Sequence, residues 1–156
     1  MRGKSFGELV AAGGVIIGLV FVGYEIRQNT NAMRSGTIQA LSEQSFDYTM
    51  RLSEDRDFLR IEAQLREPGV SRDDLSPVDR RAQELKYAAG LRIIENRFRQ
   101  FQLGTVDEAS LNQVGGASRG YYGGRQFQEW WRSRDQTLFF AHDFIEFFEA
   151  QYPPVE

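Results

Sequence analysis

The sequence predicts an all-α protein in which a single N-terminal transmembrane helix precedes a small soluble helical bundle. A long uncharged apolar segment lies near the N-terminus, and later apolar residues recur at the three- and four-residue spacing of amphipathic helices. No segment shows the period-two alternation of strands. A chain of 156 residues has room for one domain beside that segment. We expect a short tail at 1–7, the transmembrane helix at 8–26 and the helical soluble domain at 27–156.

The apolar segment, LVAAGGVIIGLVFVGY, contains no charged residue and is bounded by Glu8 and Glu25. As a helix it spans roughly 24 Å, and extension to Phe6 and Ile26 brings it close to the ~30 Å hydrocarbon core of a bilayer. A cleaved signal peptide is one alternative, but the segment ends in GYEIRQ without small residues at a cleavage site. A buried core helix is the other, since the glycines make the segment only moderately hydrophobic. An uncleaved membrane anchor fits best.

Small residues recur within this segment at steps of four, three and four, which places them on one helix face. They are Gly7, Ala11, Gly14 and Gly18. Small residues on one face allow another transmembrane helix to approach closely, and Gly14 and Gly18 form a GxxxG motif. We therefore expect helix association on this face; the alternative is that Gly and Ala are simply common in membrane helices.

Residues 28–52 can continue the membrane helix into water, because an intermittent apolar stripe persists at helical spacing, with Gly36 as its weak point. A second, short helix is expected over 55–66, ended by the Pro68-Gly69 pair.

The clearest soluble helix begins after Ser76, a natural N-cap that is followed by Pro77, and it ends at Gly104. Asp79 can complete a capping-box-like arrangement with Ser76. The apolar stripe of this helix runs at steps of four, three, four and three, so we expect the helix to form the centre of the core. The stripe consists of Tyr87, Leu91, Ile94, Phe98 and Phe101.

The C-terminal third contains shorter elements. Thr105 to Glu108 is typical of another capping box, and the helix that it starts, which carries Leu111 and Val114, ends at Gly115-Gly116. The stretch GGASRGYYGG is expected to be a break or an irregular loop. A short aromatic helix follows, and then a last helix, capped by Asp135 or Thr137, which is rich in Phe and ends at Pro153-Pro154.

Three of these features together resemble a broad group of small bacterial single-pass membrane proteins. The features are the short anchor followed by EIRQNTNAMR, the amphipathic helices in the middle, and the Trp130-Trp131 pair followed by a Phe-rich helix. The resemblance covers most of the chain. It implies an N-terminal anchor, an IRQNT-like stretch and a C-terminal WW…F…F segment, without an assigned activity. It also implies location in the bacterial inner (cytoplasmic) membrane with a cytoplasmic soluble domain, although the basic residues flanking the apolar segment tie in number and do not orient it.

His142 is the only histidine, and it lies near Asp143 and Glu146. One histidine with carboxylates is a poor zinc site and cannot form a di-iron site, so we expect a solvent-facing or capping histidine and no metal. A Ser-His-Asp triad is formally possible, but the sequence offers no β-scaffold that would hold one. The paired carboxylates Asp73-Asp74 and Glu54-Asp55 lie in polar, turn-like stretches and are interpreted as solvated caps.

The glycine-rich stretch lacks the Lys-Ser/Thr ending of a Walker motif, and no strand precedes it. Arg119 and Arg125, together with Tyr121 and Tyr122, could still contact an anion or a lipid head group. The alternative is a connection that is packed by its tyrosines.

Eight large aromatic residues lie between Phe127 and Phe148. Most should belong to the core, and a helical wheel separates Phe139 from the main aromatic face. An exposed remainder would mark contact with a partner or a membrane surface. The candidates for such a contact are Phe127, Trp130, Trp131 and Phe139.

Composition narrows the range of possible functions. The net charge of −3 argues against nucleic-acid binding, and the lack of cysteine excludes disulfides, thiolate metal sites and cysteine nucleophiles. We expect a non-enzymatic, membrane-anchored accessory or scaffolding protein without a cofactor, which associates with itself or with a larger membrane complex. One alternative is a module that binds or senses a lipid or small apolar ligand. The other is an enzyme that uses His142 and nearby carboxylates.

Overall fold

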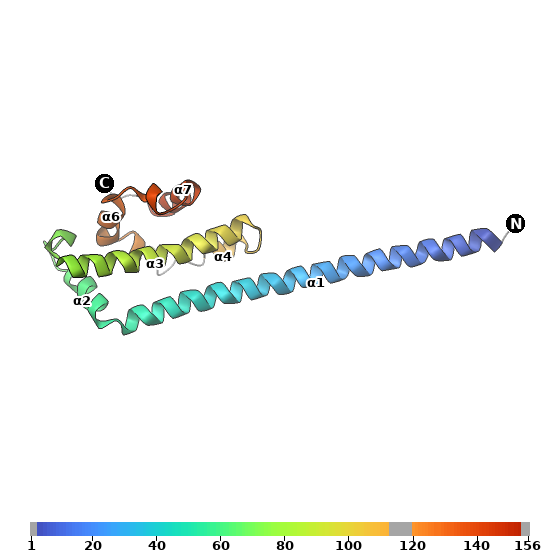
Figure 1. The fold of residues 1–156 in the computed structure, drawn as a ribbon, viewed down its shortest axis with the longest axis horizontal. Helices are drawn as coiled ribbons and strands as arrows, with labels where there is room; N and C mark the ends of the chain where they lie inside the picture. Colours follow the sequence, from blue (N-terminus) through green and yellow to red (C-terminus); the bar gives the residue numbers. More distant parts are fainter. Residues whose placement is uncertain (1–2, 113–119, 154–156) are drawn as a thin grey trace.

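The computed structural model describes residues 3–112 and 120–153, and within these ranges all regular secondary structure is helical (Figure 1). The predicted all-α class is confirmed. The α-helices are α1 (Gly3–Glu54), α2 (Arg56–Gln64), α3 (Pro77–Gln102), α4 (Glu108–Asn112), α6 (Arg125–Arg132) and α7 (His142–Gln151). Two short 3-10 helices, η1 (Arg72–Asp74) and η2 (Gln136–Leu138), join them.

Helix α1 is a single helix of 52 residues, with no break at Gly36 or at the end of the apolar segment. At 1.5 Å per residue it is roughly 78 Å long. Figure 1 shows its N-terminal part projecting away from the other helices and its C-terminal part running alongside α3. Beyond residue 27, the buried or half-buried positions of α1 are Thr37, Leu41, Ser45, Tyr48 and Leu52. Their helical spacing confirms that α1 continues out of the apolar segment as one face of the bundle.

The chain reverses at Asp55, which caps α2 by accepting a hydrogen bond from the backbone N–H of Phe58 at 2.9 Å. The Asp55 carboxylate also lies 2.7 Å from Lys86 Nζ, which joins this turn to α3. Helix α2 buries Ile61 completely in a small core of its own. The predicted short helix and the interpretation of Asp55 as a cap are therefore confirmed.

Helix α3 begins as expected: Ser76 Oγ accepts a hydrogen bond from the backbone N–H of Asp79. The Asp79 carboxylate accepts a hydrogen bond from Arg60 on α2 at 2.7 Å. The helix ends at Gly104, whose φ of +69° suits glycine. Four residues of the predicted stripe are buried, namely Tyr87, Leu91, Ile94 and Phe98, whereas Phe101 is 36% exposed at the edge.

The predicted Thr105 capping box is wrong. Thr105 Oγ donates to the carbonyl of Gln100 at 2.7 Å, so its hydroxyl closes the end of α3. Asp107 caps α4 in its place, because its carboxylate accepts a hydrogen bond from the backbone N–H of Ser110 at 2.8 Å. Thr105 and Asp107 lie two residues apart, and both residue types can cap a helix. After the chain reversal that follows α3, Asp107 is the residue at the start of α4. Val114 and Gly115-Gly116 lie outside the described residues.

The single C-terminal helix predicted from Asp135 or Thr137 onward is also wrong. Asp135 caps only η2, by accepting a hydrogen bond from the backbone N–H of Thr137, and α7 begins later, at His142. Phe140, before α7, and Phe144, within it, are both buried. The end of the glycine-rich stretch, residues 120–122, is helical, so this part is not an irregular loop.

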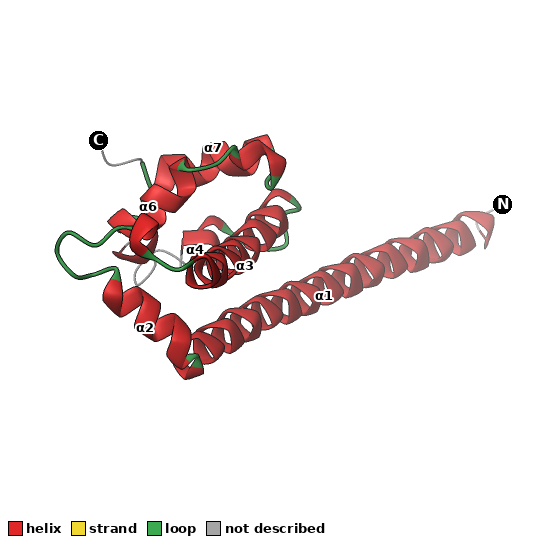
Figure 2. Ribbon diagram, turned by 60° about the vertical axis from the view of Figure 1, so that its left-hand side comes forward, coloured by secondary structure: helices red, strands yellow, loops and turns green. Residues whose placement is uncertain are grey.

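Helix α3 lies between α1 on one side and α6 and α7 on the other (Figure 2). Aromatic rings fill the contact of α3 with α6 and α7. Tyr87 lies 5.0 Å from Phe127 and 5.3 Å from Trp130, measured between ring centroids, and Trp131 lies 4.9 Å from Phe148. The expectation that α3 forms the centre of the core is confirmed.

The contact between α1 and α3 depends on Gly90. A Cβ atom at this position would lie 2.9 Å from the hydroxyl oxygens of both Tyr48 and Tyr122. Tyr48 OH donates to the carbonyl of Lys86 at 2.5 Å, which fixes its ring against α3. Glycine is therefore required for this close approach.

We expect Gly90→Ala to destabilise the protein by about 1–3 kcal/mol, because the added methyl group overpacks the contact. Gly36→Ala is the matched control: no atom lies within 4 Å of its Cβ position, and alanine there should stabilise α1 by about 0.5–1 kcal/mol. Urea unfolding monitored by circular dichroism measures both changes. Equal effects of the two substitutions would contradict the proposed close contact.

Candidate functional site

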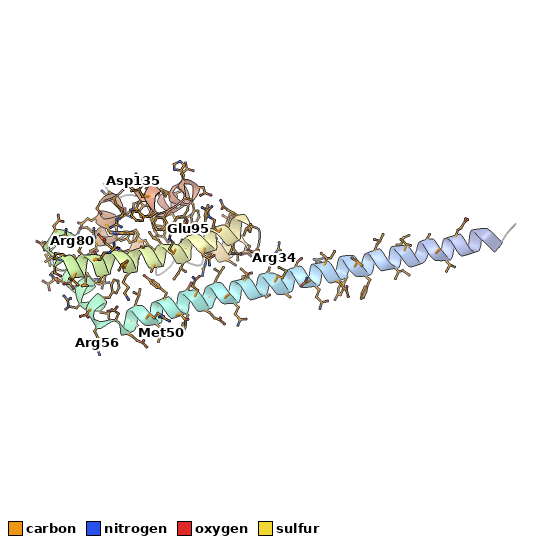
Figure 3. The ribbon with its side chains drawn as sticks, in the orientation of Figure 1. Arg34, Met50, Arg56, Arg80, Glu95 and Asp135 are labelled. Atoms are coloured by element: carbon orange, nitrogen blue, oxygen red, sulfur yellow. The ribbon has the colours of Figure 1, made fainter. Side chains whose placement is uncertain are left out.

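The apolar part of α1 is exposed on every side. Within the described residues, α1 is long and apolar enough to cross a membrane, and none of its most apolar 18-residue window is buried. Large side chains on different faces, such as Ile16, Ile17 and Leu19, are 62–72% exposed. Figure 3 shows the side chains of the N-terminal part of α1 standing clear of the bundle, whereas Arg34 lies where α1 begins to run alongside α3. A helix that is apolar all round requires an apolar environment that the rest of the chain does not supply.

The predicted small-residue face lies on this exposed part of α1. Gly7, Ala11, Gly14 and Gly18 are all exposed, and no atom lies within 4 Å of a Cβ built on the three glycines. This part of α1 projects away from the bundle (Figure 1). Another helix can therefore lie along the small-residue face without displacing the bundle.

Three of the four aromatic interface candidates belong to the core. Phe127 and Trp130 are 1% exposed and Trp131 is 3% exposed, so these three side chains do not lie on the surface of the bundle. They are buried because α6 directs one face toward α3 and the other toward α7. Phe139 remains a surface residue, 46% exposed, with the guanidinium of Arg134 5.3 Å from its ring centroid.

The residues around His142 do not converge on one site. Its side chain is 79% exposed and lies 3.3 Å from Glu146 on the same helix face. Asp143 turns away and accepts hydrogen bonds from Arg99 at 2.6 and 2.9 Å and from Gln102 at 2.9 Å. The hydrogen bond from Arg99, and to a smaller extent that from Gln102, lowers the pKa of Asp143 well below its usual range. No group of three possible metal ligands occurs among the described residues.

The described part of the glycine-rich stretch packs onto the bundle. Tyr122 is buried, and Tyr121 contacts the ring of Tyr87 edge-on at 5.6 Å. Arg125 donates hydrogen bonds to the carbonyls of Leu65 and Val70 at 3.2 and 2.9 Å, so it holds the segment after α2. These contacts favour the connection packed by its tyrosines over a head-group site. Arg119 lies outside the described residues.

A buried polar network beside α3 was not anticipated from the sequence. Arg72 Nε donates to Gln83 Oε1 at 2.8 Å, and Gln83 donates to Tyr87 OH at 3.0 Å. Tyr87 OH in turn donates to Glu62 at 2.9 Å. Burial is the main cause that raises the pKa of Tyr87, and the charge of Glu62 is the second. Gln83 lies four residues before Tyr87, on the stripe that enters the core. This position was the sequence signal that could have indicated a buried polar residue.

Arg72 also contacts Glu84, which lies 3.3 Å from Arg72, 2.8 Å from Arg134 and 3.2 Å from Arg81. Burial lowers the pKa of Arg72, and the charge of Glu84 opposes that shift. The network joins η1, α2 and α3 through buried charge-assisted hydrogen bonds. It therefore holds the bundle together without presenting an open polar site.

In comparisons with known proteins, the chain matches no protein-family model, no curated protein and no solved structure.

Removal of Arg72 should be costly, because its loss leaves Gln83 Oε1 buried without this donor. We expect Arg72→Met to lower the free energy of unfolding by roughly 2–4 kcal/mol. Arg81→Met is the matched control, since Arg81 contacts the same Glu84 carboxylate from a side chain that is 65% exposed. Its loss should cost less than about 1 kcal/mol. Chemical denaturation of both variants checks the difference, and similar costs would argue against a buried network.

Proposed function

We propose that the protein is a non-enzymatic accessory or scaffolding protein, held in the bacterial inner membrane by α1 and carrying its bundle on the cytoplasmic side. One observation carries this proposal. The apolar part of α1 is exposed on all faces, while the same uninterrupted helix enters the bundle through Leu41, Tyr48 and Leu52. An anchor built in this way fixes the bundle directly to the membrane without a flexible linker.

The energetics favour a lipid environment for the apolar segment, residues 9–24. Transfer of one Val, Leu, Ile or Phe side chain out of water contributes about 1.5–3 kcal/mol, and this segment contains many of them. The continuity of α1 past Ile26 supports an anchor that is retained over a signal sequence that is removed, because no turn or extended segment separates the apolar part from the bundle.

The small-residue face supports association with another transmembrane helix. Because the apolar part of α1 projects away from the bundle, a second copy or a helix of a larger membrane complex can approach along the whole apolar segment. The alternative function, binding of an apolar ligand, would place that ligand near Trp130 and Trp131. Both rings instead contact other core rings. His142, the centre of the enzyme alternative, is a surface residue. Scaffolding is therefore the function that we develop.

We expect the full chain to resist alkaline carbonate extraction from membranes and to show an intact mass that includes the apolar segment. The double variant Ile16→Arg and Leu19→Arg should be largely extracted, since each charge at the centre of a membrane helix costs about 2.5–3.5 kcal/mol. Met33→Arg is the control, because Met33 is similarly exposed on α1 but lies outside the apolar segment. Extraction of the unmodified chain, or a mass that lacks the segment, would contradict the anchor.

Chemical crosslinking in native membranes tests the association. The double variant Gly14→Leu and Gly18→Leu should lose the crosslinked species, because two large side chains block close approach of helix backbones. The matched control, Gly13→Leu with Gly23→Leu, places the same residues on other faces of the same segment and should retain that species. Mass spectrometry then identifies the partner as a second copy or another protein. A strictly monomeric chain, or equal effects of the two double variants, would rule out association through this face.

A further inference from the structure

One end of the bundle faces back toward the apolar part of α1. Arg97 on α3 donates to Ser45 on α1 at 3.1 Å. Tyr48, further along α1, donates to the carbonyl of Lys86, which comes earlier on α3. The two helices are therefore antiparallel, and the C-terminal end of α3 points toward the apolar segment. Figure 3 shows Arg34 of α1 beside this end of α3.

Apolar side chains are exposed at this end, which we call the α3–α4 tip (residues 101–107). Leu103, the residue that follows α3, is 72% exposed, and Phe101 is 36% exposed. Gly104 has a φ of +69°, so the chain turns directly after Leu103. Val106, by contrast, is buried in the bundle. The tip therefore presents Leu103 and Phe101 on the side of the bundle that is nearest to the membrane segment.

The distance between the tip and the bilayer follows from the length of α1. Arg34 lies eight residues beyond Ile26, which is roughly 12 Å along the helix axis. The head-group layer extends roughly 5–8 Å beyond the hydrocarbon core on each side. An upright α1 would leave a gap of about 4–7 Å between that layer and the tip. This gap is narrower than a helix with its side chains, which is about 10–12 Å wide, so it does not admit a partner helix.

A lean of α1 toward α3 brings the tip to the bilayer. Transmembrane helices tilt by roughly 20° on average, and packed helix axes lie roughly 8–10 Å apart. A tilt of this size toward α3 lowers the end of α3 by roughly 3 Å. Side chains at the tip span the remainder of the gap. Ordinary tilt is therefore sufficient for contact between the tip and the head groups.

Two cations lie between the apolar segment and the tip. Arg27 and Arg34 are exposed and seven residues apart, which places them on one face of α1. The hydrogen bonds of Ser110 are the main cause that lowers the pKa of Asp107, and the charge of Arg34 lowers it further, so this face is directed toward the tip. Arginine binds phosphate oxygens through charge-assisted hydrogen bonds. The space under the tip therefore suits lipid phosphate groups.

We propose that the α3–α4 tip rests on the bilayer surface, with Leu103 and Phe101 in the head-group layer and Arg27 and Arg34 bound to lipid phosphates. Apolar side chains gain from burial at this boundary, and aromatic rings are favoured there. The contact makes α1 lean toward α3, so it fixes the side of α1 on which the bundle approaches the membrane. This inference rests on the proposed anchoring by α1.

Fluorescence quenching of the full chain in phosphatidylcholine nanodiscs tests the contact. Because the chain contains no cysteine, single-cysteine variants can be labelled with bimane and quenched by lipids that carry a nitroxide on the head group. We expect labelled Leu103→Cys to lose fluorescence. Val78→Cys is the matched control, because Val78 is 78% exposed but lies at the other end of α3, roughly 37 Å away along the axis. It should keep its fluorescence. Leu138→Cys, 76% exposed on η2, should also keep it, which excludes attraction of the label itself to lipid.

Ile16→Cys, quenched by a nitroxide on the lipid acyl chain, tests the anchor separately. Quenching at Ile16 together with stronger quenching at Leu103 than at Val78 and Leu138 is the result that the contact requires. Quenching at Ile16 with equal fluorescence at the other three positions would overturn the contact and leave the anchor in place. A lack of quenching at Ile16 would contradict the anchor and the contact together.

Discussion

One continuous helix has to satisfy two different surroundings, and the rest of the structure depends on this constraint. Over residues 10–24, α1 is apolar on all faces and contacts nothing in the bundle. From Thr37 to Leu52 it is amphipathic, and one face forms part of the protein interior. No turn separates the two parts. Whatever environment holds the apolar part therefore also sets the position and direction of the bundle.

The bundle is built to hold α1 closely. Helix α3 accepts Tyr48 of α1 at Gly90 on one side and the aromatic rings of α6 on the other, so a single helix carries both contacts. Polar groups reinforce this arrangement: Lys86 pairs with Asp55 at the end of α1, and Arg97 reaches Ser45. The apolar part of α1 is free of the bundle, and one of its faces carries the small residues.

The sequence predicted elements whose signals are local. The Ser76 cap, the stripe of α3 and the end at Gly104 follow from spacing and backbone preference, and the structure contains all three. The choice between Thr105 and Asp107 as a cap, and the break between η2 and α7, depend on where the chain must turn to cover α3. These features are tertiary in origin. Spacing alone could not distinguish them from a simple capping box and one longer helix.

The candidate site shows the same division. The small-residue face could be identified from spacing because it lies within one helix. Burial of Phe127, Trp130 and Trp131 depends on contacts between α6, α3 and α7, so sequence alone could not separate core from surface. Nothing in the sequence distinguishes Arg72 from Arg97, and only the fold shows that, among the described residues, Arg72 has a carboxylate partner and Arg97 has none.

The central claim is that the apolar segment of α1, residues 9–24, is surrounded by lipid. Because the chain contains no cysteine, single cysteines can be introduced along α1 and labelled in native membrane vesicles with a water-soluble maleimide. The structure predicts protection on all faces through the apolar segment, with labelling restored on the exposed faces after Ile26. A labelling pattern with helical periodicity inside the segment, as expected of a helix packed against protein on one side and exposed to water on the other, would contradict the claim.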